Sequence, residues 1–515
     1  MKTSIRLALF VGVCALFAVN GQAQTAAEAR AAHAYAVAAK GGPLALHAFL
    51  DQFPKGADLH VHLSGAVYAE TFIKDAGEDG LCVDPKALTF AEPPCNAPLQ
   101  PAKELSGVLT PSEQDLYDRL VDSFSLRSYV PTASWSGHDQ FFATFGRFRG
   151  LSNHIGEWVD EIASRSAAQN QQYLELMETP SFGHAAALAH KNPLTSDLAA
   201  YRERLLAEGL KEEVAADRDD VRLAESQRKQ REHCGTPQAL PACTVTIRYI
   251  YQVLRGYSPG QVFAQTLLGF ETVQAAMEAH DDTWVGINFV MPEDGFISMR
   301  DYALQMKMVD YLHAAYPKVH ITLHAGELAP GLVPPEGLRF HIRQAIEQGH
   351  AERIGHGVDV MYEEDAPALL KEMARAHVMV EINLSSNEGI LGIKGIDHPF
   401  PLYRAAHVPV ALSTDDEGVS RIEITHEYVR AALDYHLTYA ELKQLARTGL
   451  EHNFLPGPSL WASPEVFTQA VTACRGQALG SDTPSSDCKA FLESSQKATE
   501  QWEQEHRFRA FDSHF

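Results

Sequence analysis

Short apolar or β-branched runs alternate with longer amphipathic stretches through most of the chain. The runs have lengths typical of buried strands, and the stretches between them have helical periodicity. Strands that alternate with helices predict a parallel sheet, and eight of them predict an α/β fold of the (β/α)8 TIM-barrel type. The expected strands span residues 58–63, 173–177, 244–253, 284–291, 319–324, 353–357, 378–383 and 408–414.

The segments outside this alternation give the predicted domain organisation. A barrel with insertions can reach the length of this chain without a second core. The predicted parts are an N-terminal helical segment (24–53), the barrel domain (54–456) with helical insertions at 64–171 and 178–243, and a helical C-terminal extension (457–515).

The N-terminus has the pattern of a signal peptide. Lys2 and Arg6 form a short basic region, residues 7–19 are apolar and uncharged, and residues 21–23 are small enough to precede a cleavage site. The sequence therefore predicts that residues 1–23 are removed and that the protein is exported to the periplasm or the extracellular space. No later stretch is apolar enough to predict a membrane anchor.

Seven cysteines are present, and Cys14 would leave with the signal peptide. The other six form three local pairs, which in an oxidising compartment predict three disulfides closing surface loops, with free thiols as the alternative. Because no Cys-x-x-Cys occurs, the sequence has neither a zinc knuckle nor the signature of the cysteine-ligated zinc deaminases. The pairs are Cys82 with Cys95, Cys234 with Cys243, and Cys474 with Cys488.

Composition narrows the class of partner. Hydrophobic residues make up 45% of the chain, which is ordinary for a globular protein that buries a sizeable core. The formal net charge is −23, and a surface this acidic repels phosphate backbones and anionic membranes. We therefore expect neither nucleic acid nor a membrane as the partner of the mature protein.

Histidines and carboxylates gather at the carboxyl ends of the predicted strands. Each signal alone is weak, because a lone histidine at a strand end is more often structural. In a (β/α)8 barrel, however, these ends meet at one mouth, where the active sites of this fold lie. The residues are His60 and His62 after the first strand, His324 after the fifth, His356 after the sixth, and Asp415 with Asp416 after the eighth.

Three imidazoles and a carboxylate form a nitrogen and oxygen site suited to zinc with room for water. The pKa of a zinc-bound water falls to about 7, which makes it a hydroxide nucleophile. His356 and Asp415 are available to take or orient its proton. Glu327, three residues after His324, can donate a proton to a ring nitrogen, and Asp416 can hold the edge of a substrate.

Four motifs resemble those of the adenosine and AMP deaminase family of the amidohydrolase superfamily. They occur in the family's order, and the resemblance covers residues 53–456. With its signal peptide and cysteines, the chain looks closest to the secreted growth-factor-related adenosine deaminases and their bacterial counterparts. The motifs are Pro54-Lys55-Gly56-Ala57-Asp58-Leu59-His60-Val61-His62-Leu63, His324-Ala325-Gly326-Glu327, Arg353-Ile354-Gly355-His356-Gly357 and Ser413-Thr414-Asp415-Asp416.

The resemblance implies hydrolytic deamination of adenosine or 2′-deoxyadenosine to the inosine product and ammonia. Glu327 would protonate the purine N1, His356 would position or deprotonate the water that attacks C6, and Asp416 would hydrogen-bond N7. Whether the protein forms a homodimer is left open. The implied ligands of one zinc ion per chain are His60, His62, His324 and Asp415.

Two departures from the family pattern concern the substrate. Ser64 replaces the Asp that follows His-x-His-Leu and would contact the ribose, and Met291 replaces a Gly whose backbone would contact the purine N3; Glu293 still matches. A different aminopurine, either adenine or an N6-modified adenosine, therefore stays open. Two further alternatives also stay open. One is another zinc amidohydrolase activity, and the other is a catalytically silent secreted nucleoside-binding or signalling protein. The presence of Glu327, His356 and Asp416 together opposes that last alternative, because binding alone does not require this set.

Four phenylalanines follow one another at helical spacing in the first insertion. We expect them to pack against the core, and the alternative is that they line the wall of an apolar pocket. They are Phe141, Phe142, Phe145 and Phe148.

Overall fold

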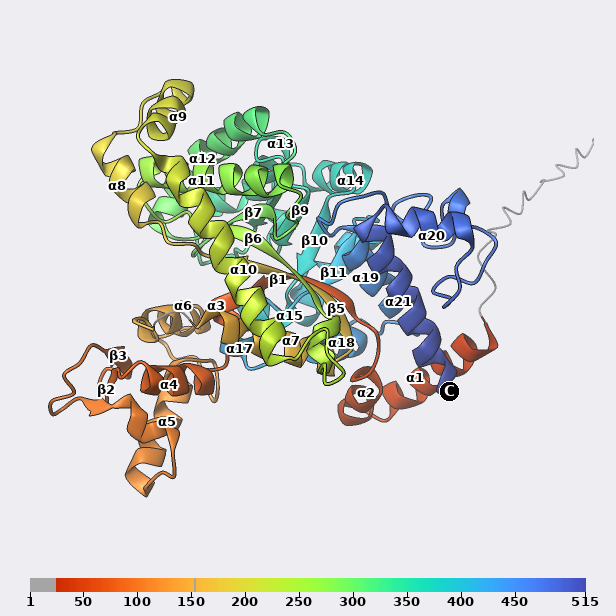
Figure 1. The fold of residues 1–515 in the computed structure, drawn as a ribbon, viewed down its shortest axis with the longest axis horizontal. Helices are drawn as coiled ribbons and strands as arrows, with labels where there is room; N and C mark the ends of the chain where they lie inside the picture. Colours follow the sequence, from red (N-terminus) through yellow and green to blue (C-terminus); the bar gives the residue numbers. More distant parts are fainter. Residues whose placement is uncertain (1–24, 152–153) are drawn as a thin grey trace, which may run out of the picture.

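A sheet of eight parallel strands curls into a barrel in the computed structural model, which describes residues 25–151 and 154–515 (Figure 1). Each strand pairs with the next one in chain order, and the predicted barrel is confirmed. The predicted signal peptide lies outside the described residues. The strands are β1 (Gly56–His62), β5 (Gln171–Glu178), β6 (Thr246–Leu254), β7 (Trp284–Val290), β8 (His320–Ala325), β9 (Arg353–His356), β10 (Met379–Ile382) and β11 (Val410–Leu412).

The barrel closes between β11 and β1 through residues at its carboxyl-end mouth. The backbone N–H of Asp415 donates to the carbonyl of His60 at 2.8 Å, and the N–H of His62 donates to the carbonyl of Asp415 at 3.2 Å. Below them, the Thr414 hydroxyl donates to Asp58 at 2.7 Å. Barrel closure therefore ties Asp415 directly to the two histidines of β1.

Helices cover the barrel, as the alternating pattern predicts. The strands are buried along almost their whole length, which explains why they read as apolar runs in the sequence. The covering helices after β6 are α11 (Pro259–Glu278), α12 (Phe296–Ala315), α13 (His341–Glu347), α14 (Ala366–Ala376), α15 (Leu384–Leu391), α16 (Phe400–Ala405), α17 (Glu417–Ser420), α18 (Ile424–Asp434) and α19 (Tyr439–Glu451).

The first insertion forms a lobe with its own apolar core, coloured orange in Figure 1. Beside the expected helices it contains a three-stranded antiparallel sheet, which the sequence does not predict. Strands of two or three residues are too short to show a two-residue period. The elements are α3 (Leu63–Ala66), α4 (Ala69–Glu78), β2 (Cys82–Asp84), β3 (Thr89–Ala91), β4 (Gln100–Pro101), α5 (Pro111–Ser123), α6 (Gly137–Arg147) and α7 (Ile155–Ala168).

The second insertion is helical, as predicted, but it breaks at Gly209, which has a φ of 102°. Its helices are α8 (Gly183–Lys191), α9 (Leu198–Ala207) and α10 (Glu213–Arg231). The three predicted disulfides are all present among the described residues. None of the described helices is both long and apolar enough to span a membrane.

The two ends of the described chain lie together. Helices α1 (Ala26–Lys40) and α2 (Pro43–Leu50) pack beside α21 (Gln496–Ser513), which follows α20 (Ser486–Glu493) (Figure 1). The C-terminal extension is helical mainly in these last two elements. Residues 457–485 form no α-helix; they contain one short 3-10 turn and an isolated β-bridge between Trp461 and Ala470, since prolines and glycines interrupt them.

Lys55 is fully buried just before β1. Its Nζ donates to the carbonyls of Leu50, Asp51 and Phe53 at the end of α2, at 2.7, 3.0 and 3.1 Å, and to the carbonyl of Gln169 beyond α7 at 2.6 Å. Burial lowers the pKa of Lys55 to about 7, while these oxygens favour its protonated form. The side chain thus joins two helix ends to the first barrel strand.

We expect Lys55→Met to lower the free energy of unfolding by about 2–4 kcal/mol, because it leaves buried carbonyl groups without a donor. Urea denaturation followed by circular dichroism would measure the loss. The matched control is Lys394→Met, since Lys394 is exposed and forms a surface ion pair with Glu388. Its expected loss is below about 1 kcal/mol. Equal losses in the two variants would contradict the role given to Lys55.

Candidate metal and catalytic site

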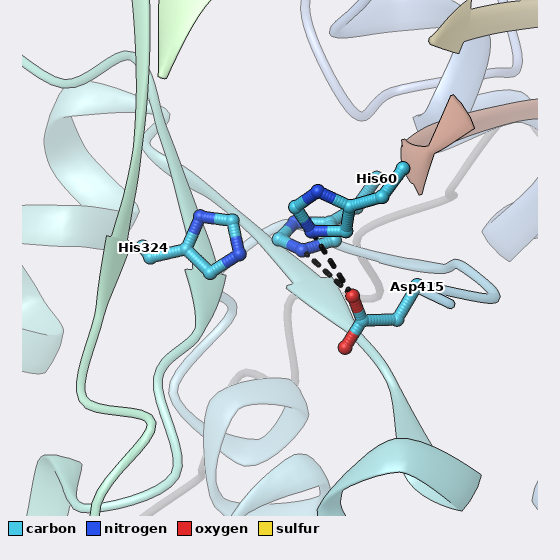
Figure 2. Close-up of side chains that lie close together, drawn as sticks. His60, His324 and Asp415 are labelled. Carbon is cyan, nitrogen blue, oxygen red and sulfur yellow. Dashed lines mark ion pairs between the residues drawn. The ribbon is translucent and has the colours of Figure 1, made fainter. Parts of the chain in front are cut away.

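Three histidines and an aspartate meet at the barrel mouth, with ligand atoms within 4.8 Å of one another. His60 and His62 come from the end of β1, His324 from β8, and Asp415 follows β11. Figure 2 shows His60 and His324 facing each other across the centre, with Asp415 completing the cluster. Asp415 Oδ1 lies 3.5 Å from His60 Nε2 and 3.2 Å from His62 Nε2.

The other ring nitrogen of each histidine is held by a side-chain oxygen from a different strand. For His324 the proton can be assigned to Nδ1. Its own backbone N–H donates to the same Asn288 oxygen at 3.0 Å, which fixes the orientation of the Asn288 amide. An Nδ1 that donates leaves Nε2 with a free lone pair. The Nδ1 contacts are His60 to Glu381 at 2.6 Å, His62 to Gln252 at 2.8 Å and His324 to Asn288 at 3.0 Å.

These residues fit a divalent cation. The Nε2 atom of His60 is buried and has no hydrogen-bond partner among the described residues, which is costly unless something binds it. Three imidazole nitrogens and one carboxylate oxygen are a donor set typical of zinc sites. The cluster can therefore hold a metal ion with His60, His62, His324 and Asp415 as its ligands.

Glu381, on β10, is buried beneath His60 and paired on its other side. Arg353 on β9 donates to Glu381 at 2.7 Å and also contacts Glu175 at 2.7 Å. Burial alone would raise the pKa of Glu381, but Arg353 and His60 outweigh it and lower that pKa to about 2. A permanent carboxylate thus holds His60 in place at neutral pH.

Glu327 lies 8% exposed in the loop after β8. Its backbone N–H donates to Glu293 at 2.7 Å, and the N–H of Gly326 donates to the other oxygen at 3.0 Å. Glu293 therefore shapes the loop that carries Glu327. Burial, with the negative charges of Asp415 and Glu293, raises the pKa of Glu327 well above its usual range, which favours a protonated carboxyl.

His356 is fully buried at the end of β9, with a φ of 69°. Its Nε2 lies 3.6 Å from Asp415 Oδ2, and its Nδ1 lies 3.7 Å from Glu327 Oε1. Burial lowers the pKa of His356 to about 3, so the ring is neutral near pH 7. Positive φ values at both His356 and Asp415 mark strained backbone at the mouth.

Asp416 points into the mouth over Gly65. A Cβ added at Gly65 would lie 1.4 Å from Asp416 Oδ1, so only glycine leaves room for this carboxyl group. That oxygen has no hydrogen-bond partner within the described part of the chain. Burial, with Asp415 beside it, raises the pKa of Asp416 well above its usual range.

A cavity of about 540 Å³ opens onto these groups, a size typical of small-molecule sites. Ser64 and Met291, the two departures from the family pattern, both line it. Met291 has a φ of 86°, a conformation that glycine adopts without strain. Phe141, Phe142, Phe145 and Phe148 all line the cavity too, so the alternative of a pocket wall is confirmed. Phe141 and Phe148 also pack into buried clusters, as expected.

The residues that hold the histidines were not predicted from the sequence. Gln252 and Asn288 are single amides within strands, and nothing in their local spacing distinguishes them. Glu381 did carry a signal, since it is a charged residue inside the apolar run of residues 378–383. A charge there is stable only with buried partners.

Comparison with known proteins agrees with this geometry. The adenosine deaminase family model matches residues 222–460. Adenosine deaminase of Pectobacterium atrosepticum is 38% identical over 137 residues, which are 26% of this chain and 37% of that protein. Adenosine deaminase of Serratia proteamaculans is 39% identical over 138 residues, which are 27% of this chain and 38% of that protein. The matched part thus spans less than two fifths of these relatives.

Solved structures share the fold over most of the chain. The Arabidopsis N6-mAMP deaminase has a TM-score of 0.51 at 20% identity, covering 79% of this chain and 95% of its own. A zinc-bound amidohydrolase from Burkholderia ambifaria has a TM-score of 0.52 at 18% identity, and the match covers 80% of this chain and 88% of that protein.

The eight-stranded barrel, with a cluster of candidate metal ligands at its mouth, has the TIM-barrel fold of these solved deaminase and amidohydrolase structures. The match of residues 222–460 to the adenosine deaminase family model and the similarity to bacterial adenosine deaminases support the adenosine/AMP deaminase family, which the sequence motifs predict. The likeness to its secreted growth-factor-related members stays a prediction.

Proposed function

We propose that the protein is a zinc-dependent deaminase that converts adenosine, or 2′-deoxyadenosine, to the inosine product and ammonia. The observation that carries the proposal is that His62, His324 and Asp415 of the metal cluster line one cavity together with the residues Glu327, His356 and Asp416. A silent binding protein would not require a buried acid and a ligand cluster at the same point. The disulfides and the predicted signal peptide support an exported enzyme.

When bound by its four ligands, zinc supplies Lewis-acid activation of a water molecule at neutral pH. Glu327 donates its proton to the purine N1, so that C6 accepts the attacking oxygen. His356 orients the attacking water. Asp416 donates to N7, which is an acceptor only, and the raised pKa of Asp416 supports the protonated form that this contact needs. Loss of ammonia from C6 completes the reaction.

A second substrate is favoured by Ser64 and Met291. Ser64 is shorter than aspartate and weakens a contact to the ribose, while the Met291 side chain occupies space beside the ring edge. Adenine and N6-modified adenosines are therefore kept as alternative substrates of the same chemistry.

The decisive experiment is to incubate purified, zinc-loaded protein with adenosine, 2′-deoxyadenosine, adenine and N6-methyladenosine and to follow ammonia release. No turnover of any of them would refute the proposed function.

We expect Met291→Gly to raise kcat/KM for adenosine by roughly 10-fold, because it frees the backbone for one more hydrogen bond to the ring. Steady-state kinetics with each of the four substrates would measure the change. Ser128→Gly is the control, since Ser128 also has a positive φ, of 57°, but lies outside the cavity lining. If both variants gain stability but neither changes substrate preference, Met291 does not contact the purine.

A further inference from the structure

A chain of buried hydrogen bonds runs from the backbone of α16 to His356. The backbone N–H of Phe400 donates to Nδ1 of His398 at 3.1 Å. The Nε2 atom of His398 lies 3.0 Å from Oδ1 of Asn387, and Nδ2 of Asn387 lies 2.9 Å from Nδ1 of His356. His398 is 2% exposed, and Asn387 and His356 are fully buried, so bulk water does not compete for these atoms.

The direction of every bond in this chain follows from its first member. A backbone N–H can only donate, so Nδ1 of His398 must accept and the proton of that ring must lie on Nε2. Burial, with Arg430 and His356 adding to it, lowers the pKa of His398 to about 3, which keeps this ring neutral. A donating Nε2 requires the oxygen of Asn387 opposite it, and the NH2 group of Asn387 is left to face His356.

We infer that Asn387 and His398 are positioning residues that hold His356 in the tautomer with its proton on Nε2. His356 then presents an N–H group, not a lone pair, to Asp415 Oδ2 at 3.6 Å. It orients the attacking water as a donor and does not remove the proton of that water. Asp415 is then the group that accepts the proton of the water. These roles of His356 and Asp415 toward the water rest on the proposed deamination, whereas the tautomer of His356 does not.

The other groups that face His356 favour the same tautomer. The Nδ2 atom of Asn383 lies 3.4 Å from Nδ1 and is a second donor toward it. The carboxylate oxygen Oε1 of Glu327 lies 3.7 Å from Nδ1, which is too far for a hydrogen bond. A proton on Nδ1 would therefore face two amide donors and no acceptor within bonding distance among the described residues.

The tautomer can be read directly by NMR, in both the zinc-loaded and the metal-free protein labelled with 15N-histidine. The His356 signals are identified by their loss in His356→Gln. We expect an unprotonated Nδ1 and a protonated Nε2 at pH 7. A protonated Nδ1, or an imidazolium ring, would overturn the inference. The reading does not depend on turnover, so it stays decisive even if none of the four substrates is deaminated.

Asn387→Asp tests the positioning role. A carboxylate accepts from both neighbours, so we expect the proton of His356 to move to Nδ1. We also expect kcat to fall about 100-fold, with KM and zinc content nearly unchanged. Asn453→Asp is the matched control, because Asn453 is also buried and its Oδ1 accepts from the backbone N–H of Leu455, away from His356. An unchanged tautomer in Asn387→Asp would overturn the inference.

His398→Phe provides a second variant should Asn387→Asp fail to fold. It removes the group that orients Asn387, so the amide is free to rotate. We expect the NMR signals of His356 to report both tautomers. A single, unchanged tautomer would show that His398 does not position Asn387.

Discussion

Glu327→Gln should abolish most turnover while leaving the metal site intact. Glutamine has nearly the same shape and can donate a hydrogen bond, but it cannot transfer a proton to the purine N1. Loss of a general acid typically costs 10²–10⁴-fold, so we expect kcat to fall by about 10³-fold. Zinc content should stay at one per chain, because Glu327 is not among the proposed ligands.

The pH profile provides an independent test of the same residue. Burial, Asp415 and Glu293 raise the pKa of Glu327, and the protonated form is the active one. Activity is therefore present below this raised pKa and is lost as the pH rises through it. We expect that alkaline limb in kcat/KM to disappear in Glu327→Gln.

The matched control for Glu327→Gln is Glu427→Gln. Glu427 is likewise a buried glutamate, but it accepts a hydrogen bond from the backbone N–H of Ser385 at the start of α15 and does not line the cavity. Its substitution should leave kcat within a few-fold of the parent. If Glu327→Gln keeps the full rate, or if both variants lose the same activity, Glu327 is not the proton donor.

The barrel could be predicted from the sequence because parallel strands covered by helices are buried on both faces and read as apolar runs. Where such strands end, a polar residue stands out, and this is how His60, His324 and Asp415 were found. The three-stranded sheet of the first insertion could not be predicted, because β2, β3 and β4 are too short to carry a pattern.

The partners of the histidines could not be predicted for a different reason. A barrel brings together residues that are far apart in the chain: Glu381 lies 321 positions from His60, and Gln252 lies 190 positions from His62. Their pairing depends on strand register, which no local spacing records. The tautomer of His356 is likewise set from outside its own strand, by Asn387 and His398.

His324→Ala should lose the metal, and this is the second large effect we expect. Removing an outer partner of a metal ligand typically weakens binding 10–100-fold, and removing the ligand itself should exceed that. We therefore expect zinc affinity to fall more than ~100-fold. Zinc stoichiometry after dialysis against a weak chelator, followed by competition with a zinc-sensitive dye, would measure it.

His320→Ala is the control on the same strand. His320 begins β8 at the far end from the mouth, where it contacts Glu352 at 2.8 Å and stacks on Phe454. Its loss should leave zinc binding unchanged. Added zinc should raise the melting temperature of the parent and of His320→Ala, since a ligand that binds only the folded state stabilises it, but not that of His324→Ala.

Imidazole should partly restore zinc binding to His324→Ala. The substitution leaves a space the size of the missing ring, and Asn288 is still present to accept from one imidazole nitrogen, as it does from Nδ1 of His324. The other nitrogen then lies where Nε2 of His324 met the cluster. Rescue would show that His324 acts through its ring nitrogen, whereas a zinc stoichiometry in His324→Ala equal to that of the parent would remove His324 from the ligand set.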